Sequence, residues 1–314
     1  MKKIVSVLLV LITIACLFQG CGKKKSDIKI GLAAPEATHG WVAGVAYYAE
    51  KYCKEKGIEY NLTTSGDAEE MEKNLDVLAD WGAQTIIMWP QWTGMGNAVA
   101  DLTQKGIHVV SFDVDIDSNG IHKVMGNNYN LGYQCAQYIA EKAGDAASVI
   151  LFNVPSAGSV SELRTQGFYD YLKETDYDIR NILEYGETEF SREIGYSEMK
   201  SVLEENAKID AVFCMDDETA IGVVKAITES GRTDIKAVTG GGGMQEYFSM
   251  IADPKYESLG LCSALYSPSM IENAIDIGID LCEGKNANRI VVLPTTIVTS
   301  ENVDEYIDPQ NTVY

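Results

Sequence analysis

The side chains in this sequence that could take part in chemistry are mainly carboxylates and aromatic rings. The chain of 314 residues contains 46 Asp and Glu but only 3 His, which leaves little material for histidine-based catalysis. Five cysteines follow residue 21, and none stands in a CxxC pair or in a Cys/His cluster. Zinc sites need such spacing, so we expect no zinc and buried free thiols, with one disulfide left open.

Two other motifs look like ligand sites but lack essential residues. Residues 240–243 are four glycines, yet no Gly-Lys-Ser/Thr follows, and Gln245 stands where a dinucleotide motif needs its third glycine. Asp113, Asp115 and Asp117 look like the start of a calcium loop, without the glycine at its sixth position or the glutamate at its twelfth. We therefore expect no metal and no cofactor, and the glycine run is expected to form a tight turn close to a ligand.

The first 25 residues have the features of an export signal with a lipid attachment site. A positively charged start precedes an apolar run at 4–18, which is too short to span a membrane. The following Gly-Cys21 resembles the lipobox of bacterial lipoproteins, in which the thiol receives a diacylglyceryl group, although Phe18 replaces the usual leucine. We expect a signal peptide at 1–21 ending at lipidated Cys21, a stalk at 22–27 and an extracytoplasmic protein anchored to the membrane. An uncleaved anchor and plain secretion are the alternatives.

The charge of the chain limits its partners. The formal net charge is −21, and the acidic residues are spread along the sequence rather than gathered in a tail. Such a surface repels nucleic acid and anionic lipid, so we expect neither as a partner. The chain that follows the signal is long enough for two domains of ordinary size.

Apolar, strand-like runs alternate with amphipathic helical patterns along the rest of the chain. The runs lie at 28–32, 85–89, 107–112, 148–152, 211–214 and 237–238. Helical spacing from Val42 to Cys53 and a capping box of Asp67 and Glu70 fill two of the intervals. Runs that are apolar on both faces predict an α/β fold of two doubly wound parallel-sheet lobes. Ligands of such sheets bind beyond the carboxyl ends of the strands, so polar and aromatic residues there are the site candidates.

Several strand-end segments occur in the order found in one known family. Residues 107–113 match a run like GIPVVTFD, residues 126–128 follow as Gly-Asn-Asn, and residues 210–222 closely match DAVFAxNDEMALG. From residue 28 to 303 the chain thus resembles the type I periplasmic sugar-binding proteins of the ribose- and galactose-binding kind. The resemblance implies an N-terminal lobe (28–126 plus 268–297) and a C-terminal lobe (127–267 plus 298–314). A three-crossing hinge would join them, with the ligand trapped between them.

The resemblance also implies which residues contact the ligand. They are His39, Trp41, Trp89, Gln91, Asp113, Glu162, Phe190, Asp216, Gly241 and Tyr266. Trp41 would stack on a sugar ring with Phe190 on the opposite side, and Asp113 would accept two hydroxyls. Glu162 stands where ribose binders carry a sugar-holding arginine, and Arg164 is expected to brace the structure. His39 is expected either to contact the ligand or to cap the first helix.

Departures from the family pattern indicate the class of ligand. Asp216 replaces the usual asparagine, with Asp217 as its structural partner, and Gly241 stands where many relatives have an aspartate. The pocket expected from these matches holds Asp113, Glu162 and Asp216 but no lysine or arginine, which disfavours anionic ligands. A small neutral carbohydrate or polyol is therefore expected, and a cationic amino sugar or amine is the alternative.

The function implied by the resemblance is that of a solute-binding protein of an ABC importer. It would be monomeric, would deliver its ligand to a membrane permease and would work by hinge closure rather than by catalysis. A glycosidase is one rival, because the cleft is expected to hold three carboxylates, but no nucleophile–base–orienter set is visible. A sensory sugar receptor for a kinase or a chemotaxis system is the other alternative.

Overall fold

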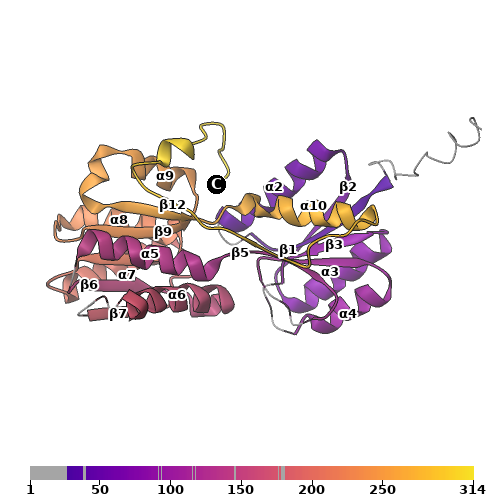
Figure 1. The fold of residues 1–314 in the computed structure, drawn as a ribbon, viewed down its shortest axis with the longest axis horizontal. Coiled ribbons are helices and arrows are strands. Elements are labelled where there is room, and N and C mark those ends of the chain that lie inside the picture. The colour runs from indigo at the N-terminus through magenta and orange to yellow at the C-terminus, as the bar shows by residue number, and fades with distance from the viewer. Residues whose placement is uncertain are drawn as a thin grey trace, which may run out of the picture.

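The computed structural model describes residues 27–37, 40–90, 92, 94–114, 116, 118–144, 146–175, 177 and 181–314. Within these residues, two six-stranded sheets lie end to end along the long axis of the molecule (Figure 1). Helices cover both faces of each sheet, so the predicted fold of two α/β lobes is confirmed. The expected signal peptide and Cys21 lie outside the described residues.

The first lobe is built on a parallel sheet with the strand order β11-β5-β4-β3-β1-β2. Its strands are β1 (Lys29–Pro35), β2 (Glu59–Ser65), β3 (Thr85–Met88), β4 (His108–Phe112), β5 (His122–Gly126) and β11 (Ile290–Leu293). The helices of one face are α2 (Gly40–Lys56) and α10 (Ile271–Cys282), and those of the other are α3 (Ala68–Asp80) and α4 (Gly96–Gln104).

The second lobe has the strand order β12-β10-β9-β8-β6-β7, with β12 antiparallel to its neighbour. Its strands are β6 (Ser148–Phe152), β7 (Asn181–Tyr185), β8 (Ala211–Cys214), β9 (Ala237–Gly242), β10 (Leu261–Leu265) and β12 (Ile297–Val298). Its helices are α5 (Asn128–Ala143) and α6 (Ser159–Thr175) on one face, and α7 (Arg192–Glu205), α8 (Asp217–Ser230) and α9 (Gln245–Ala252) on the other. Short 3₁₀ turns are η2 (Pro155–Ala157), η3 (Pro254–Leu259), η4 (Pro268–Met270) and η5 (Val303–Glu305).

The strands are apolar on both faces because both faces are covered. In β6, Val149 and Leu151 belong to the core that includes α5 and α6, whereas Ile150 and Phe152 belong to the core beneath α7 and α8. Successive side chains of a strand point to opposite faces, so a continuous apolar run fills both cores. This period explains why the predicted strands could be located from sequence.

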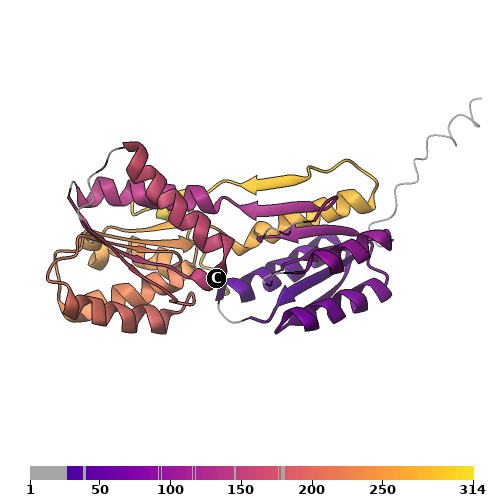
Figure 2. The ribbon, with the colours of Figure 1, turned by 90° about the horizontal axis from the view of Figure 1, so that it is seen from below.

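The chain passes between the two sheets three times. The passages lie between β5 and α5, between β10 and α10, and between β11 and β12 (Figure 2). Two of them run close together, because a Cβ on Gly126 would overlap the ring of Tyr266, which follows β10. Glycine is thus required at the end of β5, and Tyr266 lies at the junction of the lobes.

Several local predictions can be compared with the structure. Only the Asp67 half of the capping box forms. Asp67 accepts from the backbone N–H of Glu70 at 2.8 Å, but the Glu70 carboxylate accepts from the backbone N–H of Gly66 at 2.7 Å rather than from that of Asp67. The five cysteines after residue 21 are buried, as expected, and none of them belongs to a disulfide among the described residues. The glycine run does not form a turn as expected: its first three residues are the end of β9, where a Cβ on Gly240 would overlap the carboxylate of Asp217. None of the helices in the described part of the chain combines the length and the apolar character of a membrane span.

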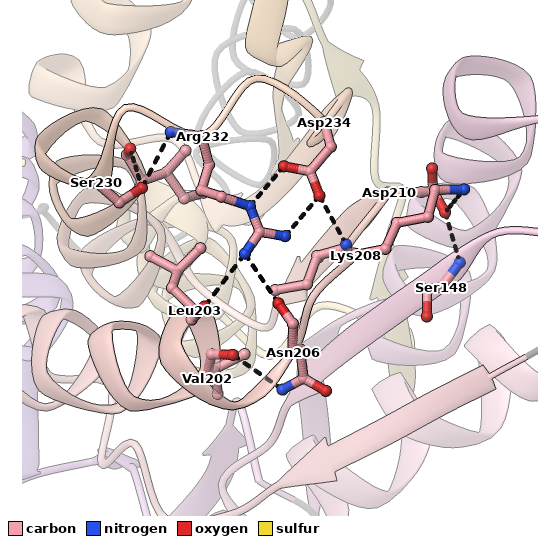
Figure 3. Close-up of polar contacts among 11 residues, drawn as sticks. Ser148, Val202, Leu203, Asn206, Lys208, Asp210, Ser230, Arg232 and Asp234 are labelled. Carbon is pink, nitrogen blue, oxygen red and sulfur yellow. Dashed lines mark hydrogen bonds and ion pairs between the residues drawn. The ribbon is translucent and has the colours of Figure 1, made fainter.

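A polar network ties together the amino ends of β6, β8 and β9 (Figure 3). At β6, the backbone N–H of Ser148 donates to the carboxylate of Asp210, which precedes β8, at 2.9 Å. The guanidinium of Arg232 donates to both carboxylate oxygens of Asp234, at 2.7 and 2.6 Å, and to the backbone oxygens of Leu203 and Asn206. Asp234 also accepts from the backbone N–H of Ile209 at 2.9 Å. The hydrogen bonds from Arg232 lower the pKa of Asp234 to about 2, so this carboxylate is charged and paired.

Candidate functional site

A cavity of about 630 Å³ lies between the lobes, where the carboxyl ends of both sheets face each other. Its walls combine aromatic rings, carboxylates and one arginine. They include Trp41, Trp89, Trp92 and Asp113 from the first lobe, Arg164, Phe190, Asp216, Glu218 and Gly241 from the second, and Tyr266 and Tyr314. The volume is in the range of small-molecule binding sites.

Three aromatic rings that line the cavity, those of Trp41, Trp89 and Tyr266, pack together with the buried ring of Phe112. The ring of Trp41 stacks on Phe112 at 6.3 Å between centroids, meets Trp89 edge-on at 5.2 Å and lies 5.7 Å from Tyr266. The indole N–H of Trp41 donates to the backbone oxygen of Tyr266 at 2.7 Å. This bond and the stacking hold Trp41 in place, so the start of α2 presents a fixed ring to the cavity.

Asp113 follows β4 in a conformation that disfavours most side chains. Its φ is +66°, and its backbone N–H donates to Val124 at 2.8 Å, which fixes the turn. Its carboxylate accepts a 2.5 Å hydrogen bond from the hydroxyl of Tyr266. Burial raises the pKa of Asp113, while this hydrogen bond and the charge of Arg164 oppose the rise. Such left-handed backbone is rare outside glycine and clusters at functional sites.

A chain of hydrogen bonds connects Asp113 to the second lobe through Tyr266. Asn128 donates to the hydroxyl of Tyr266 at 3.1 Å and accepts from Nε of Arg164 at 2.9 Å. Nη1 of Arg164 donates to the backbone oxygen of Met215 at 2.6 Å, and the guanidinium lies 4.8 Å from the centre of the Tyr266 ring. Arg164 therefore both braces the junction, as expected, and lines the cavity.

Glu162 does not line the cavity, which corrects the prediction that it contacts the ligand. Its side chain is exposed, whereas that of Arg164 is buried. A Cβ on Gly132 would overlap the backbone oxygen of Arg164, so α5 and α6 cross closely and the arginine is directed inward. The expectation of a pocket without arginine or lysine is wrong for the same reason.

Asp216 begins α8 with one carboxylate oxygen bonded and the other free. Oδ2 accepts from the backbone N–H groups of Glu218 and Thr219, at 2.9 and 3.1 Å, and so caps the helix. Oδ1 is buried without a hydrogen-bond partner among the described residues. Burial raises the pKa of Asp216 to about 6, opposed by its hydrogen bonds with Thr219. A buried acceptor without a partner in the protein marks a place where a further hydrogen-bond donor is needed.

The neighbouring Asp217 has a different role. Its carboxylate points away from the cavity lining and accepts from the backbone N–H groups of Gly243 and Met244 and from the hydroxyl of Ser263, at 2.7, 2.8 and 2.7 Å. It fastens the turn after β9 to the start of α8, which agrees with its predicted structural role.

Two further features point to a binding site. The indole N–H of Trp89 is buried without a hydrogen-bond partner among the described residues, although it lies close enough to Asp113 to favour that carboxylate's charged form. In the turn after β7, Glu189 and Phe190 line the cavity with φ of +52° and +53°. Unbonded polar atoms and strained backbone thus gather at this cavity.

Comparison of the sequence with models of protein families identifies the family of this chain. Residues 30–286 match the periplasmic binding protein domain. The chain belongs to this family. The ribose import binding protein of Bacillus subtilis is 25% identical, over 96% of this chain and all of that protein. Membership of the family implies an extracytoplasmic location, and the ribose import binding proteins to which the chain is similar are solute-binding proteins rather than enzymes.

Solved structures of this periplasmic binding protein fold superpose on most of the chain. An ABC transporter periplasmic solute-binding protein from Actinobacillus succinogenes, solved with bound D-allose, has a TM-score of 0.80 at 19% identity, over 89% of this chain and 100% of that one. The myo-inositol-binding protein of Caulobacter, solved with myo-inositol, has a TM-score of 0.77 at 19% identity, over 91% of this chain and 98% of the other. At these identities the likeness shows the fold alone.

Most residues predicted to bind ligand in this periplasmic binding protein line the cavity. They are Trp41, Trp89, Asp113, Phe190, Asp216, Gly241 and Tyr266. His39 and Gln91 lie outside the described residues. Trp92, Arg164 and Tyr314 line the cavity but were not among the predicted contacts. The sequence offered a signal for Arg164, because it is the only arginine near the family position, and none for Tyr314, which follows no strand of the lobes.

Proposed function

We propose that this protein is the extracytoplasmic solute receptor of an ABC importer and captures a small neutral carbohydrate or polyol. The observation that carries the proposal is the cavity wall, in which the rings of Trp41, Trp89 and Phe190 lie beside the carboxylates of Asp113 and Asp216. Hydroxyls of a ligand would donate to these carboxylates. The rings of Trp41 and Phe190 would contact the apolar C–H faces of the ligand.

Capture would occur by closure of the lobes. We propose lobes of 28–126 plus 268–297 and 127–267 plus 298–314, with the three passages between the sheets as the hinge. Tyr266 would link the two lobes during closure, since its hydroxyl bonds to Asp113 in one lobe and to Asn128 at the start of the other. The closed pair of lobes would present a composite surface to the permease, and the receptor would act as a monomer. The family membership and the structural neighbours support this mechanism by analogy.

A thermal-shift screen followed by calorimetry tests the proposal. The panel contains D-allose, D-galactose, D-glucose, D-ribose and myo-inositol, with glucosamine, choline and glucose 6-phosphate as charged probes. We expect one of the neutral compounds to raise the melting temperature most, and Asp113→Ala to abolish that shift. No shift with any neutral compound would contradict the proposal.

A cationic ligand is the second candidate, because acidic groups outnumber basic ones in the cavity wall. Asp113, Asp216, Glu189 and Glu218 line it against the single Arg164, whose Nε and Nη1 are already bonded to protein oxygens. A cation among these rings and carboxylates would be stabilised by both. A shift with glucosamine or choline that exceeds those of the neutral compounds would favour this candidate over the first.

We also propose that Cys21 carries the lipid anchor and that the residues before it are removed as the signal peptide. A lone acyl chain binds membranes only marginally, so two or more chains are needed for stable attachment. The test is fractionation of cells that express the full chain or Cys21→Ser. The wild type should stay in the membrane fraction, and the variant should be released. Equal retention of both would contradict the anchor.

A further inference from the structure

Residues 306–314 return from the second lobe to the space between the lobes. After β12 and η5 the chain turns back, and its last described residues lie between the lobes in both ribbon views (Figures 1 and 2). The side chain of Gln245 on α9 fixes the start of this segment. It donates to the backbone oxygen of Tyr306 at 3.1 Å and accepts from the backbone N–H of Asp308 at 2.7 Å.

The far part of this segment is bound to the first lobe. Nδ2 of Asn311 donates to the hydroxyl of Tyr48 on α2 at 2.8 Å and to the backbone oxygen of Tyr314 at 2.6 Å. Oδ1 of Asn311 accepts from the backbone N–H groups of Val313 and Tyr314, at 3.1 and 3.3 Å. One asparagine thus shapes the turn and ties it to α2, so the segment bridges the lobes outside the three passages of the hinge.

Tyr314 fills the space between the two lobes and forms part of the cavity wall. Only 4% of its surface is exposed, although the strand that precedes it in the sequence, β12, ends at Val298. On the first-lobe side, a Cβ on Gly44 would lie 3.3 Å from the Cβ of Tyr314. On the second-lobe side, the phenol reaches Gly242, where φ is +143° and a Cβ would overlap the hydroxyl oxygen. Glycines on both sides make room for this ring.

We propose that residues 308–314 form a strap that seals the ligand cavity, and that Tyr314 is a specificity-determining residue of the site. Its ring closes the side of the cavity between α2 and the end of β9 and so excludes ligands that extend in that direction. The part of this inference that concerns specificity rests on the proposed binding of a sugar or polyol. The sealing role does not depend on the ligand.

The sealing role is tested first in the ligand-free protein, by acrylamide quenching of tryptophan fluorescence. Three of the four tryptophans line the cavity, namely Trp41, Trp89 and Trp92. We expect Tyr314→Ala and a chain ending at residue 307 to be quenched more strongly than the wild type. Tyr48→Phe, which removes the hydroxyl bonded to Asn311, should be quenched more strongly than the wild type but less strongly than Tyr314→Ala and the shortened chain. Tyr47→Phe is the matched control, because it removes an exposed hydroxyl from the same helix. Equal quenching of all variants would overturn the strap.

The specificity role is tested by calorimetry with hexose-sized probes (D-allose, D-galactose, myo-inositol) and disaccharides (melibiose, cellobiose, lactose). We expect Tyr314→Ala to bind the best hexose-sized probe about tenfold more weakly and to gain affinity for at least one disaccharide, while Tyr314→Phe keeps the wild-type preference. Tyr48→Phe should weaken binding about fivefold without changing the preference. Tighter binding of the small probes by Tyr314→Ala would show that the ring obstructs the site and would overturn the proposal. If the wild type bound none of the probes, the proposed sugar binding would fail, and quenching would still decide the strap.

Discussion

The two ends of the second sheet hold their carboxylates in opposite ways. At the amino end, Asp234 is bonded through both oxygens to Arg232 and its pKa is lowered to about 2 (Figure 3). At the carboxyl end, Asp216 is buried with Oδ1 unbonded, and its pKa is raised to about 6. The same sheet therefore carries one carboxylate whose charge the fold stabilises and one whose charge the fold opposes.

This difference separates stability from binding in physical terms. A charged group with all its hydrogen bonds made contributes to folding and has nothing to offer a ligand. A buried acceptor with an open position costs stability in the free protein, and a hydroxyl donor from a ligand can remove that cost. We therefore expect substitutions at the amino end of the sheet to change stability without changing affinity. Substitutions of the cavity carboxylates should lower the affinity for the ligand and raise the stability of the free protein.

The largest expected effect is that of Asp216→Asn on stability against pH. Because the folded pKa of about 6 exceeds the ordinary value of 3.8, the native state binds the proton more tightly, and wild-type stability falls as pH rises from about 4 through 6. Asparagine keeps the helix cap and does not titrate. Urea unfolding from pH 3.5 to 7.5 should show the variant gaining roughly 3 kcal/mol on the wild type over this range.

The matched control is Asp234→Asn, for which the sign is reversed. Its folded pKa of about 2 lies below 3.8, so the wild-type advantage is present above about pH 4 and is lost as pH falls through 2. Acid titration of unfolding should show the wild type ahead by about 2 kcal/mol at neutral pH. Parallel pH profiles for the two variants would contradict the contrast between the two ends of the sheet.

The next effect in size is that of Asp113→Asn on binding. Asparagine tolerates the positive φ of this position, so the backbone is retained while the charge is lost. The variant loses charge-assisted hydrogen bonds to two ligand hydroxyls, so we expect its affinity to fall about 100-fold. Calorimetry measures this loss with whichever of D-allose, D-galactose or myo-inositol binds the wild type.

Asp113→Gly adds an independent stability readout at the same position. Glycine relieves both the positive φ and the burial of the carboxylate, so the ligand-free protein should be more stable by about 1 kcal/mol while binding is lost. A variant that binds as the wild type does would remove Asp113 from the site.

Arg232→Ala should have the opposite outcome at the amino end. Loss of the guanidinium leaves Asp234 unpaired and the backbone oxygens of Leu203 and Asn206 without this donor. We expect the free energy of unfolding to fall by about 2 kcal/mol, with the affinity for the sugar probes unchanged. Chemical denaturation and calorimetry on the same preparation check both parts. Arg232→Lys should recover only part of the stability, because an ammonium cannot pair with both carboxylate oxygens.

The same comparison shows what could be predicted from sequence. Six of the twelve strands in the described residues were located from sequence. Both faces of each sheet are covered, which makes local runs such as 149–152 fully apolar. Asp113 and Asp216 were predicted because they match family positions near the ends of strands, where parallel sheets place ligands, and both line the cavity. Tyr314 could not be found in this way, since its position depends on a long return of the chain and on room made by Gly44 and Gly242.

Glu162 and Arg164 show a different limit. A family match fixes a helix to within a residue or two, which is accurate enough for the fold but not for the direction of a side chain. Residues two positions apart on an α-helix point in directions that differ by about 200° around the helix axis. At most one of Glu162 and Arg164 can therefore face the cavity. The close crossing of α5 and α6 at Gly132, a tertiary feature, decides in favour of Arg164.

The smallest expected effect is therefore that of Glu162→Ala. Its side chain is exposed and outside the cavity lining, so affinity and stability should both change by less than about 0.5 kcal/mol. Arg164→Lys is the matched comparison two residues away. It should weaken binding and lower stability, because lysine cannot bond Asn128 and Met215 in the same fork geometry. If calorimetry showed Glu162→Ala to be the more damaging of the two, α6 would present its other face to the ligand, and the cavity described here would be incorrect on that side.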